Sequence, residues 1–168
     1  MSVLVFLDQA DGHIKKSSFE AASYAAKTAS LLGTTAEALV LGTVNDDLSL
    51  LGNFGIKKVH TVADAALNNL DAQVYTSIIA QASDAINADV IVFSNNSAAK
   101  AVAPRLSVRL KAGLVSGAIA LPDISNGFAV KKTVFSGKAF ANIAVTSAKK
   151  IISLNPNSFT IEKGTDTS

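Results

Sequence analysis

Residues 71–94 read DAQVYTSIIAQASDAINADVIVFS, a helical pattern that is followed directly by the clearest strand in the chain. The first part, residues 71–87, repeats apolar side chains at helical spacing and so predicts an amphipathic helix. The expected buried stripe of this helix is Val74, Ile78, Gln81 or Ala82, and Ala85. Residues 89–94 are nearly all apolar, which predicts a buried strand. A helix that leads into such a strand is typical of a βαβ unit around a parallel sheet.

The residues before this stretch alternate between strands and helices in the same way. Strands are expected at residues 3–7, 38–41 and 58–62. The first of them is almost continuously apolar, as expected for a central parallel strand that helices cover on both faces. Ser17 and Glu20 have the spacing of a capping box, which predicts that a helix begins there and ends at Gly33.

The next helical pattern contains Pro104, which is comfortable only in the first turn of a helix. We therefore expect a helix that begins near Val102 and ends at Gly113. Residues 114–116 are expected to form a further strand after it.

The last third of the chain has short apolar runs separated by turn residues, such as Asn126-Gly127 and Ser136-Gly137. This pattern predicts antiparallel β-hairpins rather than further crossovers. The expected strands are residues 118–121, 128–135, 139–146 and 150–154.

Together these elements predict one α/β domain over residues 1–160. We expect a three-layer α/β/α arrangement with a mostly parallel sheet and with antiparallel hairpins in the C-terminal third. Residues 161–168 are polar and have no apolar period, which predicts an interdomain linker or a disordered tail.

The composition limits the classes of partner. Hydrophobic residues make up 49% and charged residues 17% of the 168 residues, and cysteine is absent. No apolar run approaches the roughly 20 residues that a membrane-spanning helix needs, so we expect no membrane span. The lack of cysteine excludes disulfides and thiol nucleophiles. A formal net charge of +2 gives no reason to expect nucleic acid as a partner.

The sequence contains no recognisable catalytic or metal-binding motif. The glycine spacing of dinucleotide and phosphate loops is missing, and the glycine pair in Gly52–Gly55 is expected to end a helix. His13 and His60 each lack a carboxylate or serine in a known motif, and Asp46-Asp47 is expected to cap a short helix. We therefore predict no catalytic residues and no metal site.

Short polar side chains follow two of the expected strands. Asp8 follows the first strand, and Ser94, Asn95 and Asn96 lie at the end of the strand at residues 89–94. Ligands usually bind an open α/β sheet at the carboxyl ends of its strands. These four residues are therefore candidate contacts for an adenine nucleotide or a neighbouring domain. Turn formation and helix capping also explain them without any ligand.

Two segments resemble a known family. Residues 99–116, AKAVAPRLSVRLKAGLVS, resemble a characteristic stretch of the electron transfer flavoprotein alpha subunit. Residues 135–141, FSGKAFA, resemble the hairpin of that family that reads YAGNALA. The opening strand, residues 55–59 and residues 155–159 follow in the family's order, so the resemblance covers nearly the entire chain.

The resemblance implies an FAD-carrying heterodimer that accepts electrons from dehydrogenases and passes them to a quinone oxidoreductase. It also implies an adenine-nucleotide-hydrolase-like fold for the amino-terminal domain of the alpha subunit, which packs with the beta subunit. The flavin would lie mainly on the carboxyl-terminal domain, and AMP would bind in the beta subunit.

The glycine- and serine-rich flavin segment of the family has no counterpart in this sequence, so no flavin ligand is assigned. We expect a scaffold and docking domain that is a component of an electron carrier and not an enzyme, with FAD bound only in the complete heterodimer. The expected compartment is the cytoplasm of a bacterium or the mitochondrial matrix of a eukaryote. The alternative is a stand-alone adenine-nucleotide-binding α/β module that uses strand-end positions such as Asp8 and Ser94.

Overall fold

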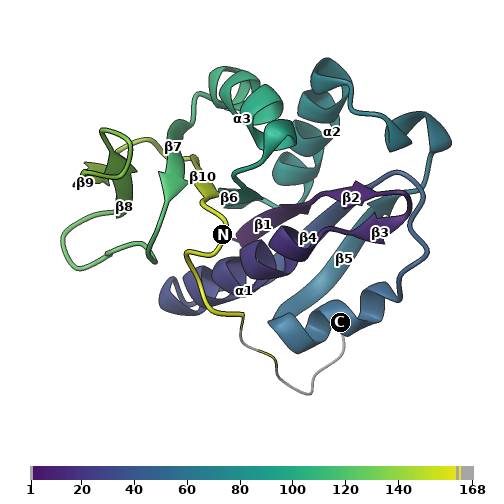
Figure 1. Ribbon diagram of the computed structural model, residues 1–168, viewed down its shortest axis with the longest axis horizontal. Helices are drawn as coiled ribbons and strands as arrows, with labels where there is room; N and C mark the ends of the chain where they lie inside the picture. Colours follow the sequence, from purple (N-terminus) through teal and green to yellow (C-terminus); the bar gives the residue numbers. More distant parts are fainter. Residues whose placement is uncertain (1, 162, 164–168) are drawn as a thin grey trace.

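An eight-stranded sheet runs through the computed structural model, which describes residues 2–161 and 163 (Figure 1). In spatial order the strands are β5 (Ile56–Val62), β4 (Ala36–Leu41), β1 (Ser2–Leu7), β6 (Ala88–Ser94), β10 (Lys150–Leu154), β7 (Gly113–Ala118), β8 (Ala129–Val134) and β9 (Ala139–Ala144). The strands from β5 to β7 pair in parallel, and β8 and β9 continue the sheet antiparallel. The expected mostly parallel sheet with an antiparallel C-terminal end is confirmed.

Helices cover both faces of the parallel part of the sheet, which confirms the three-layer arrangement (Figure 1). One face packs against α1 (Lys16–Leu31) and the short 3-10 helix η1 (Leu48–Phe54). The other face packs against α2 (Ala72–Ala85), α3 (Ser97–Leu110) and the 3-10 helix η2 (Ala65–Asn68). Strand β1 alternates between the two cores, since Val5 faces the α1 side and Leu4 faces the α2 and α3 side. Both side chains are fully buried, as expected for a central parallel strand.

The position of β10 corrects one expectation. The sequence pattern predicted a hairpin strand at residues 150–154, but β10 lies between β6 and β7 and runs parallel to both. Ile151 pairs with Ile91 on one side and with Leu114 on the other. A short strand that is apolar on both faces is buried best in the middle of the sheet, between two helical layers. The separate strand expected at residues 118–121 does not form. Ala118 is instead the last residue of β7.

Helix α3 begins earlier and ends earlier than expected. Asn96 is its N-cap, and the Asn96 side-chain Oδ1 accepts a hydrogen bond of 3.0 Å from the Ala99 backbone N–H. Pro104 therefore lies in the helix interior, which the sequence analysis had excluded. The alanine-rich residues before Pro104 favour the helix strongly enough to offset the one backbone hydrogen bond that proline cannot donate. The helix ends at Leu110, and Lys111 rather than Gly113 takes the left-handed conformation, with φ of 52°.

The start of α1 does not use the expected capping box. Lys15 is the N-cap residue and makes no side-chain capping bond. Ser17 and Glu20 lie within the first turns, and the carboxylate of Glu20 bonds to a distant segment. The end of the helix is as expected, with Gly33 in the left-handed conformation at φ of 66°.

Helix α2 is present, but a different stripe of it is buried. The Asp71 carboxylate accepts the backbone N–H groups of Gln73 and Val74, as expected for an N-cap. Val74 is 43% exposed, however. The buried residues of α2 are Tyr75, Thr76, Ile79, Ala80 and Ser83. The inner face is thus rotated by about one residue, or roughly 100°, from the predicted stripe.

The expected tail at residues 161–168 lies mostly outside the described residues. Ile161 is described, and it packs against the core on the α1 side.

Candidate functional site

The candidate residues do come together at the carboxyl ends of β1, β6 and β10, which are neighbours in the sheet. After β1 the chain forms a small hairpin of β2 (Gln9–Ala10) and β3 (His13–Ile14) before α1 begins. Asp11 and Gly12 make its two-residue turn with φ values of 53° and 81°. This hairpin was not predicted, although Asp-Gly is one of the strongest hairpin signals known.

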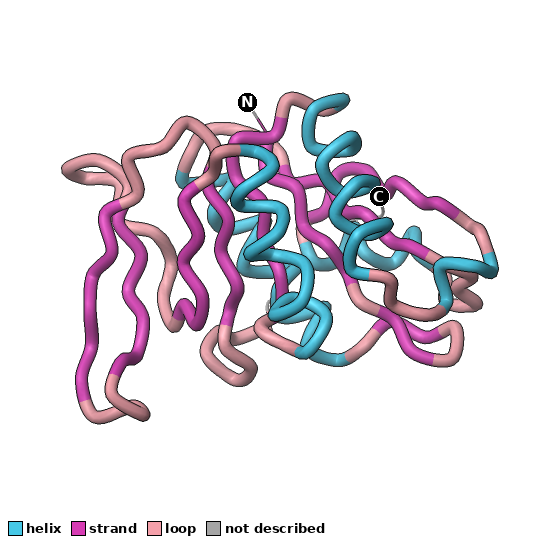
Figure 2. The backbone as a smooth tube through the Cα atoms, turned by 90° about the horizontal axis from the view of Figure 1, so that it is seen from above, coloured by secondary structure: helices cyan, strands magenta, loops and turns pink. Residues whose placement is uncertain are grey.

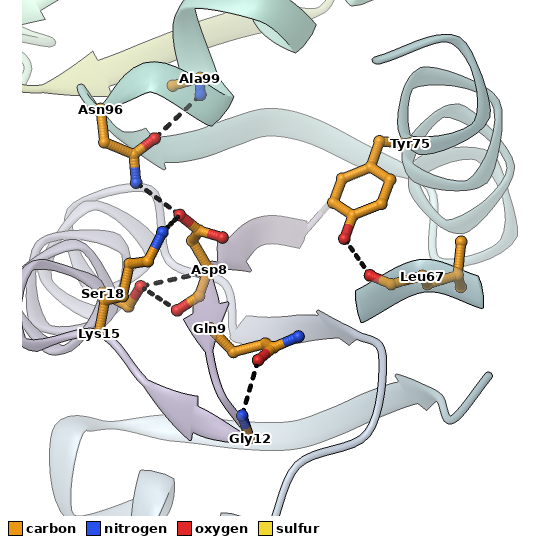
Figure 3. A network of polar contacts seen from close by, with 9 residues as sticks. All are labelled: Asp8, Gln9, Gly12, Lys15, Ser18, Leu67, Tyr75, Asn96 and Ala99. Carbon is orange, nitrogen blue, oxygen red and sulfur yellow. Dashed lines mark hydrogen bonds and ion pairs between the residues drawn. The ribbon is translucent and has the colours of Figure 1, made fainter. Parts of the chain in front are cut away.

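Asp8 is held by three other residues at this edge (Figure 3). Its carboxylate Oδ2 accepts a hydrogen bond from the Lys15 ammonium at 2.5 Å and from the Asn96 side-chain amide at 3.0 Å. The Asp8 backbone N–H donates to the Ser18 hydroxyl, and that hydroxyl donates to the Asp8 carbonyl, both at 3.0 Å. The carboxylate thus forms an ion pair with Lys15 and a hydrogen bond with Asn96, the N-cap residue of α3.

Asn95 belongs to a second set of contacts on the side of β10. Its backbone N–H donates to the Leu154 carbonyl at 2.7 Å, and its side-chain amide donates to Asn155 Oδ1 at 2.7 Å. The Ser153 hydroxyl donates to Asn95 Oδ1 at 3.3 Å. Ser94, the last residue of β6, is buried, and its carbonyl accepts the Asn96 backbone N–H. These residues tie the ends of β6 and β10 together.

A polar hollow of about 320 Å³ opens beside the ends of β1 and β4. The residues that line it are Gln9, Asp11, Gly12, Thr43, Asn45, Asn68 and Asn69. Several of its polar groups bond to one another: Gln9 Oε1 accepts the Gly12 N–H at 3.1 Å, and Asn68 Oδ1 accepts the Thr43 N–H at 2.8 Å. At Gly42, with φ of 89°, a Cβ atom would come within 2.7 Å of Asn68 Oδ1. The side chains of Asn68 and Gln9 therefore lie close against the backbone of Gly42 at the end of β4.

The polar side chains at this edge bond to other groups of the protein. The Asp8 carboxylate and the side chain of Asn95 are already engaged within the protein. The loop that follows β6 begins with two asparagines rather than with glycines that would let backbone approach a pyrophosphate. The arrangement is chemically suited to fixing strand ends and helix starts relative to one another.

The electrostatics of the edge extend to Tyr75. Burial, and secondly the negative charge of Asp8, raise the pKa of the Tyr75 hydroxyl above its ordinary value. The hydroxyl donates a short hydrogen bond to the Leu67 carbonyl, so the protonated form is the one that the fold requires (Figure 3).

Each histidine lies beside a carboxylate that the sequence analysis did not foresee. His13 Nδ1 is 2.8 Å from Asp46 Oδ1, and His60 Nε2 is 2.6 Å from Glu37 Oε2. The hydrogen bond from His13, followed by that from the Ile14 backbone, lowers the pKa of Asp46. These partners are distant in sequence, so no local motif could reveal them. As expected, the neighbouring Asp47 caps η1.

The segment after β10 is fastened to α1 by Glu20, which the sequence analysis had assigned to a capping box. Glu20 is 6% exposed, and its carboxylate accepts three consecutive backbone N–H groups. The donors are Asn157 at 2.9 Å, Ser158 at 2.7 Å and Phe159 at 2.8 Å. Charged acceptors form the stronger class of protein hydrogen bond, so this carboxylate fixes where the chain leaves the sheet.

Among the described residues, no three His, Asp or Glu side chains gather closely enough to hold a metal ion. None of the helices described is both long enough and apolar enough to cross a membrane.

Comparison with known proteins bears directly on these observations. Residues 3–168 match the family model described as the electron transfer flavoprotein domain. The chain is 28% identical over 155 residues to the electron transfer flavoprotein subunit alpha of Bacillus subtilis strain 168, covering 92% of this chain and 47% of that protein. It is 27% identical over 154 residues to the same subunit of Syntrophomonas wolfei, covering 90% of this chain and 47% of that protein.

A third relative carries a different name. The lactate dehydrogenase (NAD(+),ferredoxin) subunit LctC of Acetobacterium woodii is 22% identical over 149 residues, which cover 88% of this chain and 36% of LctC. The chain therefore spans less than half the length of these curated relatives. The resemblance seen in residues 99–116 and 135–141 is confirmed, and because the family model covers nearly every residue, this chain belongs to the electron transfer flavoprotein domain family.

Proposed function

We propose that this chain is the amino-terminal scaffold and docking domain of an electron transfer flavoprotein alpha subunit. It works as a component of an electron carrier, within an FAD-containing heterodimer that takes electrons from dehydrogenases and delivers them to a quinone oxidoreductase. The observation that carries the proposal is the match of residues 3–168 to the family, together with alignment to less than half of two alpha subunits.

The strand-end geometry supports the scaffold role. In related α/β sheets this edge is where a ligand would bind, but here Asp8, Asn95 and Asn96 bond to neighbouring side chains. The flavin is accordingly held by residues outside this chain, and AMP by the beta subunit. The Glu20 carboxylate fixes the position of the segment that follows β10.

Association with a beta subunit tests this proposal. We expect the tagged chain, co-expressed with the electron transfer flavoprotein beta subunit of the same organism, to elute as a complex of one copy of each in size-exclusion chromatography with light scattering. The matched control is the tagged chain expressed alone, mixed with the beta subunit after purification. If the beta subunit bound neither this chain nor a complete alpha chain that contains it, the result would contradict the proposal.

A further inference from the structure

The two edges of the eight-stranded sheet differ in how they are protected. The β5 edge carries Lys57 and Lys58, both exposed. The β9 edge, residues 139–144, reads AFANIA and contains no charged residue and no proline. An edge strand presents unpaired backbone N–H and C=O groups, and natural proteins usually guard such edges with lysine, proline or a covering element. Strand β9 lacks the first two of these.

The hairpin of β8 and β9 also exposes large apolar side chains. Phe135 in its turn is 80% exposed, and Phe140 and Ile143 on β9 are 63% and 37% exposed. Figures 1 and 2 show the hairpin at one side of the molecule, beyond the helices that cover the parallel strands. Exposed aromatic and aliphatic groups on an open strand edge are the features of an interaction surface.

Lysine charges lie next to this uncharged strand. The ammonium of Lys131 on β8 lies over the Phe140 ring, 4.6 Å from its centroid, so its charge is placed on the edge strand. Lys138 is exposed at the start of β9. A second copy of this chain, paired at the same edge, would bring further lysines to the same strip and would be repelled. An acidic partner would be attracted.

We propose that β9 is the docking edge for an extended strand of the partner subunit, a strand with apolar side chains and at least one carboxylate. The inference rests on the proposed function and assigns a surface to it. The added strand would hydrogen-bond to the outer backbone groups of β9 at the usual spacing of about 4.8 Å. Its apolar side chains would cover Phe140 and Ile143, and its carboxylate would lie near Lys131 and Lys138.

The test compares one substitution at each edge, in the chain co-expressed with the beta subunit of the same organism. Ile143→Lys places a charge on β9, and Val62→Lys is the matched control on β5, because both side chains are 37% exposed. We expect Ile143→Lys to weaken binding of the beta subunit about thirtyfold or more, and Val62→Lys to change it less than about twofold. Far-ultraviolet circular dichroism and thermal unfolding check that both variants fold.

A second measurement needs no substitution. In hydrogen exchange of the wild-type complex, the amides of residues 139–144 should exchange more slowly than in the free chain, while those of β5 should not change. Normal binding by Ile143→Lys without protection of β9 would overturn the docking edge and leave the proposed function standing. No binding by the wild-type chain would overturn both. Self-association of the free chain that Ile143→Lys abolishes would replace the partner by a second copy and so overturn the proposal.

Discussion

Replacement of Glu20 by alanine is expected to lower the free energy of unfolding by about 3 kcal/mol. The Glu20 carboxylate accepts three backbone N–H groups from residues 157–159, and alanine would leave these part-buried donors without their charged acceptor. Glu20→Gln keeps the size of the side chain but offers one acceptor oxygen in place of two, and we expect a loss of about 2 kcal/mol. Urea unfolding followed by circular dichroism measures both values.

Asp123→Ala is the control for the Glu20 variants. Asp123 also accepts a backbone N–H, from Ser125, but it lies on an exposed turn. We expect little change in stability for this variant. If Glu20→Ala were no more destabilising than Asp123→Ala, the inference that Glu20 holds residues 157–159 against α1 would be wrong.

Replacement of Tyr24 by alanine is expected to destabilise the chain by about 4 kcal/mol, because a fully buried aromatic side chain is removed. The Tyr24 ring packs edge-on against Phe159 with centroids 5.6 Å apart, and its hydroxyl donates to the Ala120 carbonyl at 2.9 Å. Tyr24→Phe retains the ring and removes only this hydrogen bond, so it should cost about 1 kcal/mol at neutral pH. Thermal and urea unfolding of the two variants separate the two contributions.

The pH dependence of stability gives an independent check on Tyr24. Burial raises the pKa of the Tyr24 hydroxyl above its ordinary value of 10.0, so the folded chain holds this proton more tightly than the unfolded chain does. The free energy of unfolding therefore falls as the pH rises above about 10, where the unfolded chain loses the proton first. We expect Tyr24→Phe to fall less steeply in this range, and the remaining fall to come partly from Tyr75, whose pKa is also raised. Equal slopes for the wild type and Tyr24→Phe would contradict the buried, neutral hydroxyl.

The sequence predicted which helices and strands form more reliably than it predicted which of them are neighbours in the sheet. The helix expected at residues 71–87 and the strand expected at residues 89–94 follow from local signals, and the structure has both. The place of β10 in the sheet depends on pairing with β6 and β7, which no local pattern contains. Its apolar residues on both faces were nevertheless a sign of a central strand. Helix α3 begins earlier than predicted because the helix-forming residues before Pro104 outweigh a single proline.

The same distinction holds for the candidate site. Asp8, Asn95 and Asn96 lie at one edge of the sheet, as expected from the parallel strands that precede them, and their contact with a ligand stays a prediction. Their partners Lys15 and Asn155 could not be inferred, because each contact depends on the fold of a separate segment. Glu20 was misassigned for the same reason, since its hydrogen-bond donors lie 137 to 139 residues further along the chain.

Calorimetric titration of the purified chain with FAD, AMP and ATP tests most directly whether this chain is a scaffold without a cofactor of its own. An absorbance scan for flavin carried through purification should come first. We predict no flavin absorbance and no binding heat for any of the three nucleotides. Tight binding of AMP or ATP would instead identify a stand-alone nucleotide module, and tight binding of FAD would contradict the assignment of the flavin to residues outside this chain.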